Sequence, residues 1–557
     1  MTRRKRVWIT VIVLAGTALL AGIAFVCSDT LVTKTVNSRV RQMIGNAGNY
    51  HIDYGSMVVL LGSRTVEIRD IVLCTDTTDS LAESTAGMSI HIKHVALRHI
   101  SLRRLLQDKH LHIGRLSVDE PEIVIHRPSE KQQKQQAKLQ NKNTRQQTDT
   151  TKTQSLLTGI DIGRIKIHDG KVRLSNTGNR MLLTIDDIQL AAHDIGYNMH
   201  SDSVSYNDSC YSIALKDISF TSADGLYKTT AESLTTEDAG AVVAKRVHCY
   251  NTVKKTALAD KKGKVPVTWS DIRLHEVNTS PVNIIRQVLS KKINIDKIRI
   301  AGEKVNIYRD VRYKPKKPYP MPQEPLLTMK MPLRIKAVQL VMPQVDIEMA
   351  TQNISSGLLQ LKQVQCGISN VTNRRGDNMT ANIHTMFIHG GEGDMSLTLK
   401  IDKASHFDFA ANLKDMHGDT FNQFLRPLFG AEATYNIHSV KTQYSGDRRR
   451  ATGTFCMVYD NMQVRIIKED TPYKMIARNA DAINLFAPVV LQKRNPRQQG
   501  KEPQSYQVAK ERDEMSNFSV YLMGPILDGV LKTVLPGSIV RYIGKRAANA
   551  DRQKTTQ

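Results

Sequence analysis

The chain has 557 residues, of which 40% are hydrophobic and 5% aromatic, and it carries a formal net charge of +25. Its basic residues are scattered, and few aromatic side chains are available to stack on bases, which argues against a nucleic-acid-binding protein. A basic surface facing anionic lipid headgroups and a general adaptation for solubility both remain open as explanations of the charge.

The N-terminus combines a basic cytoplasmic tail, residues 1–6, with an apolar run, residues 7–27, that contains no charged residue. At about 1.5 Å per residue this run forms a helix about 30 Å long, the thickness of one hydrocarbon core. The flanking positive charge predicts a transmembrane anchor with its N-terminus in the cytoplasm and the rest of the chain across the membrane. A cleaved signal peptide is the alternative, and it fits less well because the run is long and lacks a small-x-small pair at its end.

The next segment, residues 28–127, is predicted to be an N-terminal β module. It begins with a helical apolar stripe over Leu31–Met43 and contains a short helix near Ser101 to Leu106. Residues 128–156 are rich in Gln and Lys and almost free of large apolar side chains. Such a composition cannot bury enough surface to order itself, and we expect a disordered, solvated loop there.

The remaining chain is expected to be mostly β, with two irregular regions. Proline-rich residues 313–327 favour a stiff, extended connection rather than a strand. The end of the chain, Phe518–Ile543, is apolar but contains prolines and charges that argue against a second membrane span and favour amphipathic helices capping the sheet. In chain order the predicted segments are β repeats at 157–312, the connection, β repeats at 328–470 with a short helix at Phe421–Phe429, a helical C-terminal region at 471–545, and a tail at 546–557.

One apolar spacing occurs five times, with hydrophobic residues at offsets 0, 2, 5, 7, 12 and 14 and polar residues in most gaps. Residues two apart lie on one side of a strand. The three-residue step breaks that phase, and a β-bulge there would return the chain to the same face. The four residues that separate the two halves often include Gly or Pro, which predicts a hairpin turn. Each copy is therefore predicted to be a strand, a kink, a turn and a second strand, with one apolar face.

The first four positions of each copy are predicted to line that face. They are Leu111, Ile113, Leu116 and Val118; Ile160, Ile162, Ile165 and Ile167; Leu183, Ile185, Ile188 and Leu190; Ile293, Ile295, Ile298 and Ile300; and Leu333, Ile335, Val338 and Leu340. The predicted fold is mainly β with few helices: an elongated, twisted, antiparallel β-groove built from repeated hairpins and capped by C-terminal helices.

Motifs of enzymes and metal sites are missing from the sequence. It contains no Gly-rich phosphate loop, nucleophile elbow, zinc-protease helix or EF-hand loop. The pairs His91/His94 and His110/His112 lack a third ligand at a usual spacing, and the six cysteines form no Cys-x-x-Cys pair. We therefore expect no catalytic residue, no metal and no cofactor.

Several segments resemble AsmA-like envelope proteins, particularly those of Bacteroidota. In the N-terminal part these are the anchor, Val66–Leu73, Val95–Leu106 and Leu111–Arg127, the last with a Pro before paired β-branched residues and a closing Arg. In the C-terminal third they are Arg450–Tyr459 and Asn495–Asp513. The resemblance implies a bridge-like lipid-transfer protein of the inner membrane, whose periplasmic β-groove carries phospholipid acyl chains between membranes and supports outer-membrane homeostasis.

Two other interpretations stay open. The sheet edge or groove could bind unfolded β segments as a scaffold for outer-membrane protein assembly. Alternatively, the protein could be purely structural, with its apolar faces packed into a closed sandwich core.

Overall fold

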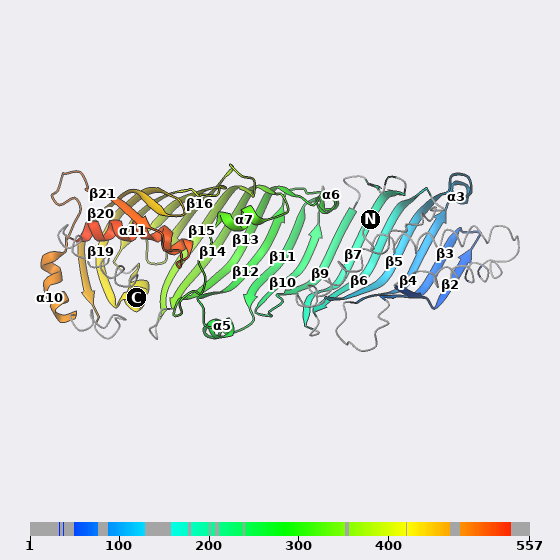
Figure 1. Ribbon diagram of the computed structural model, residues 1–557, viewed down its shortest axis with the longest axis horizontal. Coiled ribbons are helices and arrows are strands. Elements are labelled where there is room, and N and C mark those ends of the chain that lie inside the picture. Colours follow the sequence, from blue (N-terminus) through cyan, green and yellow to red (C-terminus); the bar gives the residue numbers. More distant parts are fainter. Residues whose placement is uncertain are drawn as a thin grey trace, which may run out of the picture. The chain divides into compact units, whose positions relative to one another are not determined.

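The computed structural model describes residues 33, 37, 50–75, 87–127, 158–176, 180–199, 201, 203–206, 211–237, 240–350, 356–418, 420–467 and 480–535. The chain divides into two compact units, Met1–Arg246 and Val247–Gln557. In each unit the strands lie side by side (Figure 1). The described part of the protein is therefore mainly β, as the sequence predicts.

The first unit contains ten strands and one described helix, α3 (Leu102–Asp108). The strands are β1 (Tyr50–Asp53), β2 (Ser56–Leu60), β3 (Thr65–Thr75), β4 (Met88–Ile100), β5 (His110–Arg127), β6 (Gly159–Asn176), β7 (Met181–Asn198), β8 (Ser203–Ser205), β9 (Tyr211–Thr221) and β10 (Tyr227–Thr236). β1 and β2 both pair with β3, β8 and β9 both pair with β7, and the other pairs follow chain order. β11 (Val242–Asn251) carries the chain into the second unit.

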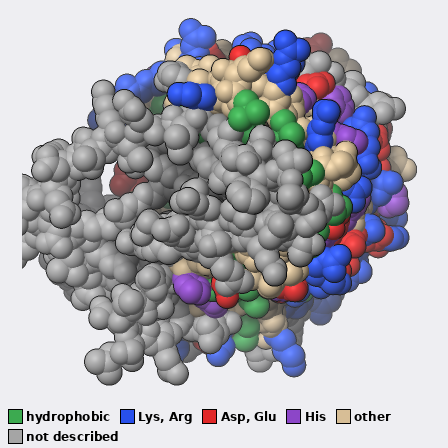
Figure 2. All heavy atoms as spheres, turned by 90° about the vertical axis from the view of Figure 1, so that its right-hand side faces the viewer, with side chains coloured by type: hydrophobic (Ala, Val, Ile, Leu, Met, Phe, Trp, Pro, Cys, Tyr) green, Lys and Arg blue, Asp and Glu red, His purple; other side chains and the backbone are tan. Residues whose placement is uncertain are grey.

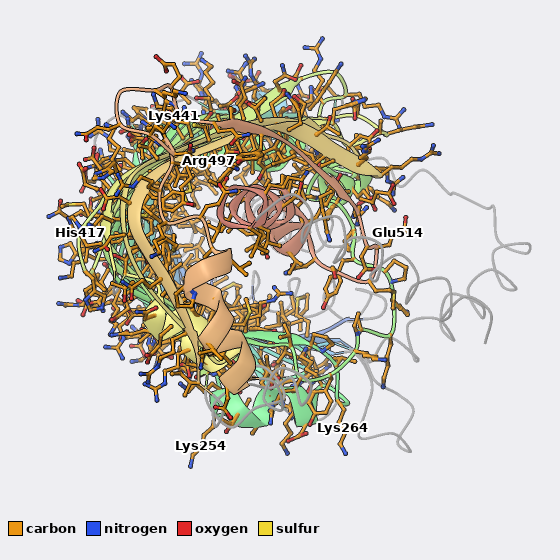
Figure 3. All side chains as sticks on the ribbon, turned by 90° about the vertical axis from the view of Figure 1, so that its left-hand side faces the viewer. Lys254, Lys264, His417, Lys441, Arg497 and Glu514 are labelled. Carbon is orange, nitrogen blue, oxygen red and sulfur yellow. The ribbon has the colours of Figure 1, made fainter. Side chains whose placement is uncertain are left out.

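The second unit pairs its strands in chain order from β12 to β21. They are β12 (Val267–Thr279), β13 (Ile293–Asp310), β14 (Leu333–Ala350), β15 (Ser356–Thr372), β16 (Asn378–Phe387), β17 (Glu392–Lys400), β18 (Phe407–His417), β19 (Ala431–Gly446), β20 (Arg450–Ile466) and β21 (Ser505–Glu511). Its helices are η2 (Lys255–Ala257), α5 (Leu258–Lys261), α6 (Ile284–Ser290), α7 (Gln323–Thr328), α8 (Asn422–Phe429), α10 (Ala480–Val490) and α11 (Phe518–Val534). Seen from the β19–β21 end, the sheet of this unit curves and α11 lies on its concave side (Figure 3).

The hairpin interpretation of the repeat is wrong. Each of the five copies lies in a single strand of 18 residues, namely β5, β6, β7, β13 and β14. The gap between the two halves contains a local irregularity rather than a turn. In β5 and β6 Glu120 and Asp169 adopt left-handed φ angles of 49° and 53° there, as in a bulge. The strand thus changes phase at the long gap and continues in the same direction.

The prediction of an all-antiparallel sheet is also wrong, because β5–β6 and β13–β14 are parallel pairs. In both pairs every repeat position faces its equivalent: Leu111 pairs with Ile160 and Ile125 with Leu174, just as Ile293 pairs with Leu333. When two parallel strands have bulges at equivalent positions, their apolar residues must have the same spacing if the side chains are to lie on one face of the sheet. In four of the five copies the repeat therefore reflects an in-register parallel pair, whereas the fifth copy, β7, pairs antiparallel with β6.

The predicted short helices are confirmed at α3 and α8, and a helix near the C-terminus is present as α11. The exposed side of α11 carries Val520, Met523, Leu527 and Leu531, so this helix is not polar on its outer side. Thr33 and Asn37, the two described residues of the predicted Leu31–Met43 stripe, are both helical. The predicted anchor 7–27, the loop 128–156 and the tail 546–557 lie outside the described residues. Among the described helices, none has the length and apolar character needed to cross a membrane.

Candidate functional site

Cross-strand pairing in the second unit places apolar side chains of successive strands in rows. One row consists of Val277, Ile300, Leu340, Cys366, Ile383, Met395, Ala411, Thr442 and Phe455. The next consists of Thr279, Ile298, Val338, Ile368, Ala381, Leu397, Phe409 and Tyr444. At about 4.8 Å between strands, nine strands extend a row over about 38 Å. The predicted pairs Ile293–Leu333 and Ile295–Ile335 lie on the same face. We call these rows together the apolar face.

The first unit has an equivalent apolar face, which brings together its twelve predicted residues. Its main rows are Ile68, Val95, Val118, Ile167, Leu190 and Ile213; Val66, Leu97, Leu116, Ile165 and Ala192; Ile100, Ile113, Ile162 and Ile195; and Leu73, Ile90, Ile123, Val172 and Ile185. Leu111 pairs with Ile160, Leu183 with Leu174, and Ile188 with Leu215. The repeat positions thus form rows in both units.

The apolar faces are only partly covered. Among the predicted lining residues, Leu111, Ile113, Val118, Ile160 and Ile162 are buried. The other fifteen are half-buried: Leu116, Ile165, Ile167, Leu183, Ile185, Ile188, Leu190, Ile293, Ile295, Ile298, Ile300, Leu333, Ile335, Val338 and Leu340. Soluble proteins rarely leave so large a contiguous apolar surface accessible unless something binds to it.

The buried end of the first unit is a core in which β1–β6 and α3 take part. Two described residues from the N-terminal helical stripe contact β2 and its neighbouring turn. The Thr33 hydroxyl accepts a hydrogen bond from the Val59 amide at 3.0 Å, and the Tyr54 hydroxyl donates to the Asn37 side chain. These bonds place Thr33 and Asn37 next to the first strands of the sheet.

In the second unit, α11 covers the apolar face over β18–β20. Phe518, Tyr521, Leu522 and Ile526 pack in one cluster with Phe407, Phe409 and Tyr444 of the strands. The Tyr444 hydroxyl donates to the Leu522 carbonyl, and burial raises the pKa of Tyr444 well above its usual range. Gly529 lies so close to the Phe455 ring that an added Cβ would be 2.2 Å from its Cγ. The helix therefore docks tightly on the strands at this end of the unit.

The same helix also protects the free edge of β21. Asp528 accepts a hydrogen bond from the Ala509 amide at 3.2 Å, and Lys532 donates to the Gln507 carbonyl at 2.9 Å. Asp528 and Lys532 pair with each other at 2.7 Å. An exposed strand edge invites pairing with other chains, and side-chain capping of its backbone groups prevents this.

A crossover segment, residues 311–332 including α7, connects the parallel strands β13 and β14; we call it the strap. Near the end of β13, the Lys316 ammonium donates to the Gly263 carbonyl at 3.0 Å. Three residues later the Tyr319 amide donates to the Glu514 carbonyl at 2.8 Å, beyond the end of β21. The Cα atoms of Lys316 and Tyr319 are three residues apart and therefore at most about 11 Å from each other. Within this short stretch the strap contacts two opposite margins of the sheet. Lys264 and Glu514 mark these margins in Figure 3.

Met321 anchors the strap on the apolar face. Its side chain is 0% exposed and packs with Leu399, Phe407 and Tyr521. Gln323 donates to the His406 carbonyl at 3.0 Å, and Glu324 pairs with Arg448. The strap and α11 therefore cover the same part of the face, and the two elements share one core.

The opposite face of the sheet is polar and charged. Arg299 on β13, Gln339 on β14 and Asn382 on β16 are exposed and lie between the apolar rows, with Gly367 of β15 paired between the last two. Cross-strand ion pairs bridge this face, such as His384 to Asp394 at 2.8 Å. The surface in Figure 2 likewise shows Lys and Arg interspersed with Asp, Glu and His. On the part of the surface visible in Figure 2, the positive charge is thus interspersed with negative charge rather than gathered in one patch.

The histidines considered as ligands lie on strands β4 and β5. His94 pairs with Asp119 at 2.9 Å and His110 with Asp161 at 2.9 Å, whereas His112 lies 3.4 Å from Arg104. No cluster of three metal-binding side chains occurs within the described ranges. Cys74, Cys366 and Cys456 are free thiols, and burial raises the pKa of Cys366 and Cys456.

No protein-family model matches the sequence, and no curated protein matches it. The apolar face, the strap and the C-terminal cover are therefore interpreted from their own geometry.

Sequence reasoning missed the strap, Met321 and the edge-capping role of Asp528 and Lys532. Equal apolar spacing does not by itself reveal a parallel pair, since β6 and β7 share it and pair antiparallel, but a long connection between two copies is compatible with the crossover that a parallel pair requires. The proline-rich stretch between the last two copies is such a connection. Nothing in the sequence alone identifies Asp528 and Lys532 as caps of a strand edge.

Proposed function

We propose that the protein is a non-catalytic lipid carrier of the AsmA-like type, which holds acyl chains against its apolar faces and conducts phospholipid between the inner and outer membranes. In this proposal residues 7–27 anchor it in the inner membrane and the rest lies in the periplasm. The observation that supports this proposal most directly is the set of apolar rows that cross β12–β16 and whose side chains are half-buried.

The physical chemistry of the rows supports this proposal. Each methylene of a lipid tail that leaves water gains about 0.8 kcal/mol, so an acyl chain favours such a surface strongly. Between β12 and β16 the rows contain mainly Ile, Leu and Val, with no charged side chain at the paired positions. A surface of similar chemistry along its length has no deep minimum that would trap a tail, and tails can slide along it.

The strap supports the same proposal. It passes between the two margins of the second unit's sheet through Lys316 and Tyr319. A bridge at this position would keep a lipid tail from leaving sideways while its headgroup stays in water. In this interpretation the concave side of the sheet is a groove, and the strap closes one section of it.

Two observations weigh against the alternatives. A scaffold that adds β segments at the edge of β21 would need that edge free, and α11 caps it, so this form of the scaffold alternative is disfavoured. A purely structural protein would bury its apolar rows, yet fifteen of the predicted lining residues are half-buried.

The test compares neighbouring residues that lie on opposite faces of β14. Val338→Asp places a charge in an apolar row, whereas Gln339→Asp places the same charge on the exposed polar face. Native mass spectrometry of the detergent-purified protein counts bound lipids per chain. We expect Val338→Asp to lose most of the bound lipid and Gln339→Asp to retain it, with circular dichroism confirming that both are folded. Equal lipid in both folded variants would refute the proposal.

A further inference from the structure

A pocket of about 970 Å³ lies at the end of the second unit, apart from the apolar rows. Its walls come from β19, from residues 458–465 of β20, from α10, and from the loop that follows α10 (residues 491–499). The volume is that of a typical small-ligand site.

The pocket occupies a gap along the edge of β20. β21 pairs only with residues 450–456 of β20. Beyond them the loop that follows α10 bonds to the edge of β20: Tyr459 exchanges backbone hydrogen bonds with Asn495, and the Met462 amide donates to the Lys493 carbonyl at 3.1 Å. Further on, Asn484 of α10 bonds both backbone groups of Ile466. Val464, between these two covered stretches, lines the pocket.

The acidic groups of the pocket already have partners. Glu432 pairs with Arg426 at 2.8 Å. Asp460 accepts hydrogen bonds from His438 at 2.7 Å and from Asn436 at 2.9 Å, and these bonds hold the pKa of Asp460 below its ordinary value. Both carboxylates of the pocket therefore already have partners on the strands.

The basic groups of the pocket are not compensated in this way. Arg465, Lys493 and Arg494 line it together. Within the part of the chain that the structure describes, none of these three side chains forms an ion pair with a carboxylate. Although the charge of Arg494 helps to lower the pKa of Asp460, the pocket is lined by three cations and two carboxylates, and a concave site with an excess of positive charge attracts anions. Guanidinium and ammonium donors suit phosphate oxygens in particular.

We propose that this pocket binds a phosphate-bearing anion, the chemistry shared by a phospholipid headgroup and a soluble phosphate ester. Hydrogen bonds connect this pocket to α11, the helix that covers the apolar face over β18–β20. Tyr459 lines the pocket and donates to the Gln492 carbonyl at 2.7 Å, and the Gln492 amide donates to Val534, the last residue of α11, at 2.9 Å. Anion binding stands on the pocket alone; only a lipid as the source of the phosphate rests on the proposed transport function.

The test removes two positive charges from the pocket and, as a control, two from elsewhere. Lys493→Gln/Arg494→Gln is the pocket variant, and Lys403→Gln/Lys441→Gln is the control, since both of its lysines are exposed and outside the pocket. Lys441 lies on the outer side of the sheet in Figure 3. In the soluble arm of the test, calorimetry measures the binding of glycerol 3-phosphate. In the lipid arm, flotation measures the binding of the protein to phosphatidylglycerol or phosphatidylcholine vesicles.

We expect the pocket variant to weaken binding about tenfold or more in at least one arm, while the control variant matches the wild type. Dependence in the soluble arm alone identifies a phosphate ester as the ligand, and dependence with phosphatidylglycerol vesicles identifies a lipid headgroup; both support the site. Equal binding by both variants in both arms, or no binding by the wild type, overturns it. Val338→Asp should leave glycerol 3-phosphate binding intact even if it abolishes lipid co-purification, which separates failure of the pocket from failure of the groove.

Discussion

The two halves of the second unit's apolar face differ in exposure although the same rows run through both. From β12 to β16 the row members Val277, Ile300 and Ile383 are half-buried, whereas Ala411, Thr442 and Phe455 on β18–β20 are buried. The strands follow one another without interruption between these halves. What changes is the cover, because the described core that α11 and Met321 form with the strands is centred on β17–β20 and reaches only Met379 on β16. Exposure of the first half is thus not a consequence of strand structure.

The side chains differ in the same sense. The covered half contains aromatic rings that interlock with the helix: Phe407 meets Tyr521 edge-to-face at 5.7 Å and Phe518 at 5.3 Å. The rows of the open half contain aliphatic residues such as Ile298 and Val338. The interlocked aromatic rings of the covered half form a permanent core. The half-buried aliphatic side chains of the open half form a surface that can adapt to a bound molecule. The comparison therefore separates a part of the face used for folding from a part left for binding.

The largest effect should come from a cavity in the covered half. Phe455 is 0% exposed and lies against Gly529 of α11, and Phe455→Ala should lower the free energy of unfolding by about 3–5 kcal/mol. Ile300→Ala removes a half-buried side chain from the same row and should cost about 1–2 kcal/mol, since less surface leaves an apolar environment. Urea unfolding followed by circular dichroism measures both. Equal losses would mean that the two halves do not differ in packing.

A second test detaches the strap from the covered half. Met321→Asp places a charge in the core beneath α11, while Met329→Asp changes a strap residue that is 39% exposed. We expect Met321→Asp to speed tryptic cleavage between Lys316 and Lys317 about tenfold or more, because proteases cleave locally opened segments. Met329→Asp should leave the cleavage rate near that of the wild type.

Limited proteolysis with mass spectrometry of the fragments locates the cut. If both variants are cleaved at the wild-type rate while remaining folded, Met321 does not hold the strap. The interpretation of the strap as a fixed bridge would then be wrong.

The sequence predicted the apolar face more accurately than the topology. Spacing alone placed residues such as Ile165 and Leu340 on one face, because a strand's alternation requires nothing beyond its own residues. It did not distinguish a hairpin turn from a bulged strand, since Pro121 and Gly170 are typical of turns and also occur at bulges. The structure keeps both residues inside long strands.

The direction of pairing and the cover could not be derived in the same way. Whether Ile293 pairs with Leu333 in parallel depends on where the connecting chain runs, which is a long-range property. The burial of Met321 depends on residues about 80 to 200 positions later, from Phe407 to Tyr521. Such contacts leave no periodic pattern in the local sequence. The half-burial of the predicted lining residues likewise depends on which distant elements cover them, and not on their local sequence.

The smallest effect concerns pH and the open half. Burial raises the pKa of Asp346 on β14, but hydrogen bonds from Gln344, Gln360 and Lys304 outweigh it and lower the pKa below the ordinary value of 3.8. A carboxylate with a lowered folded-state pKa stabilises the fold above its unfolded pKa, and this stabilisation is lost as the pH falls through the lowered value. The free energy of unfolding of the wild type should therefore fall between neutral pH and pH values below 3.8, and the fall should be smaller in Asp346→Asn. Urea unfolding at a series of pH values measures the slope, with Asp296→Asn as the control because Asp296 is exposed and forms a surface pair with Lys336. An unchanged slope in Asp346→Asn would show that this buried network does not set the acid stability of the open half.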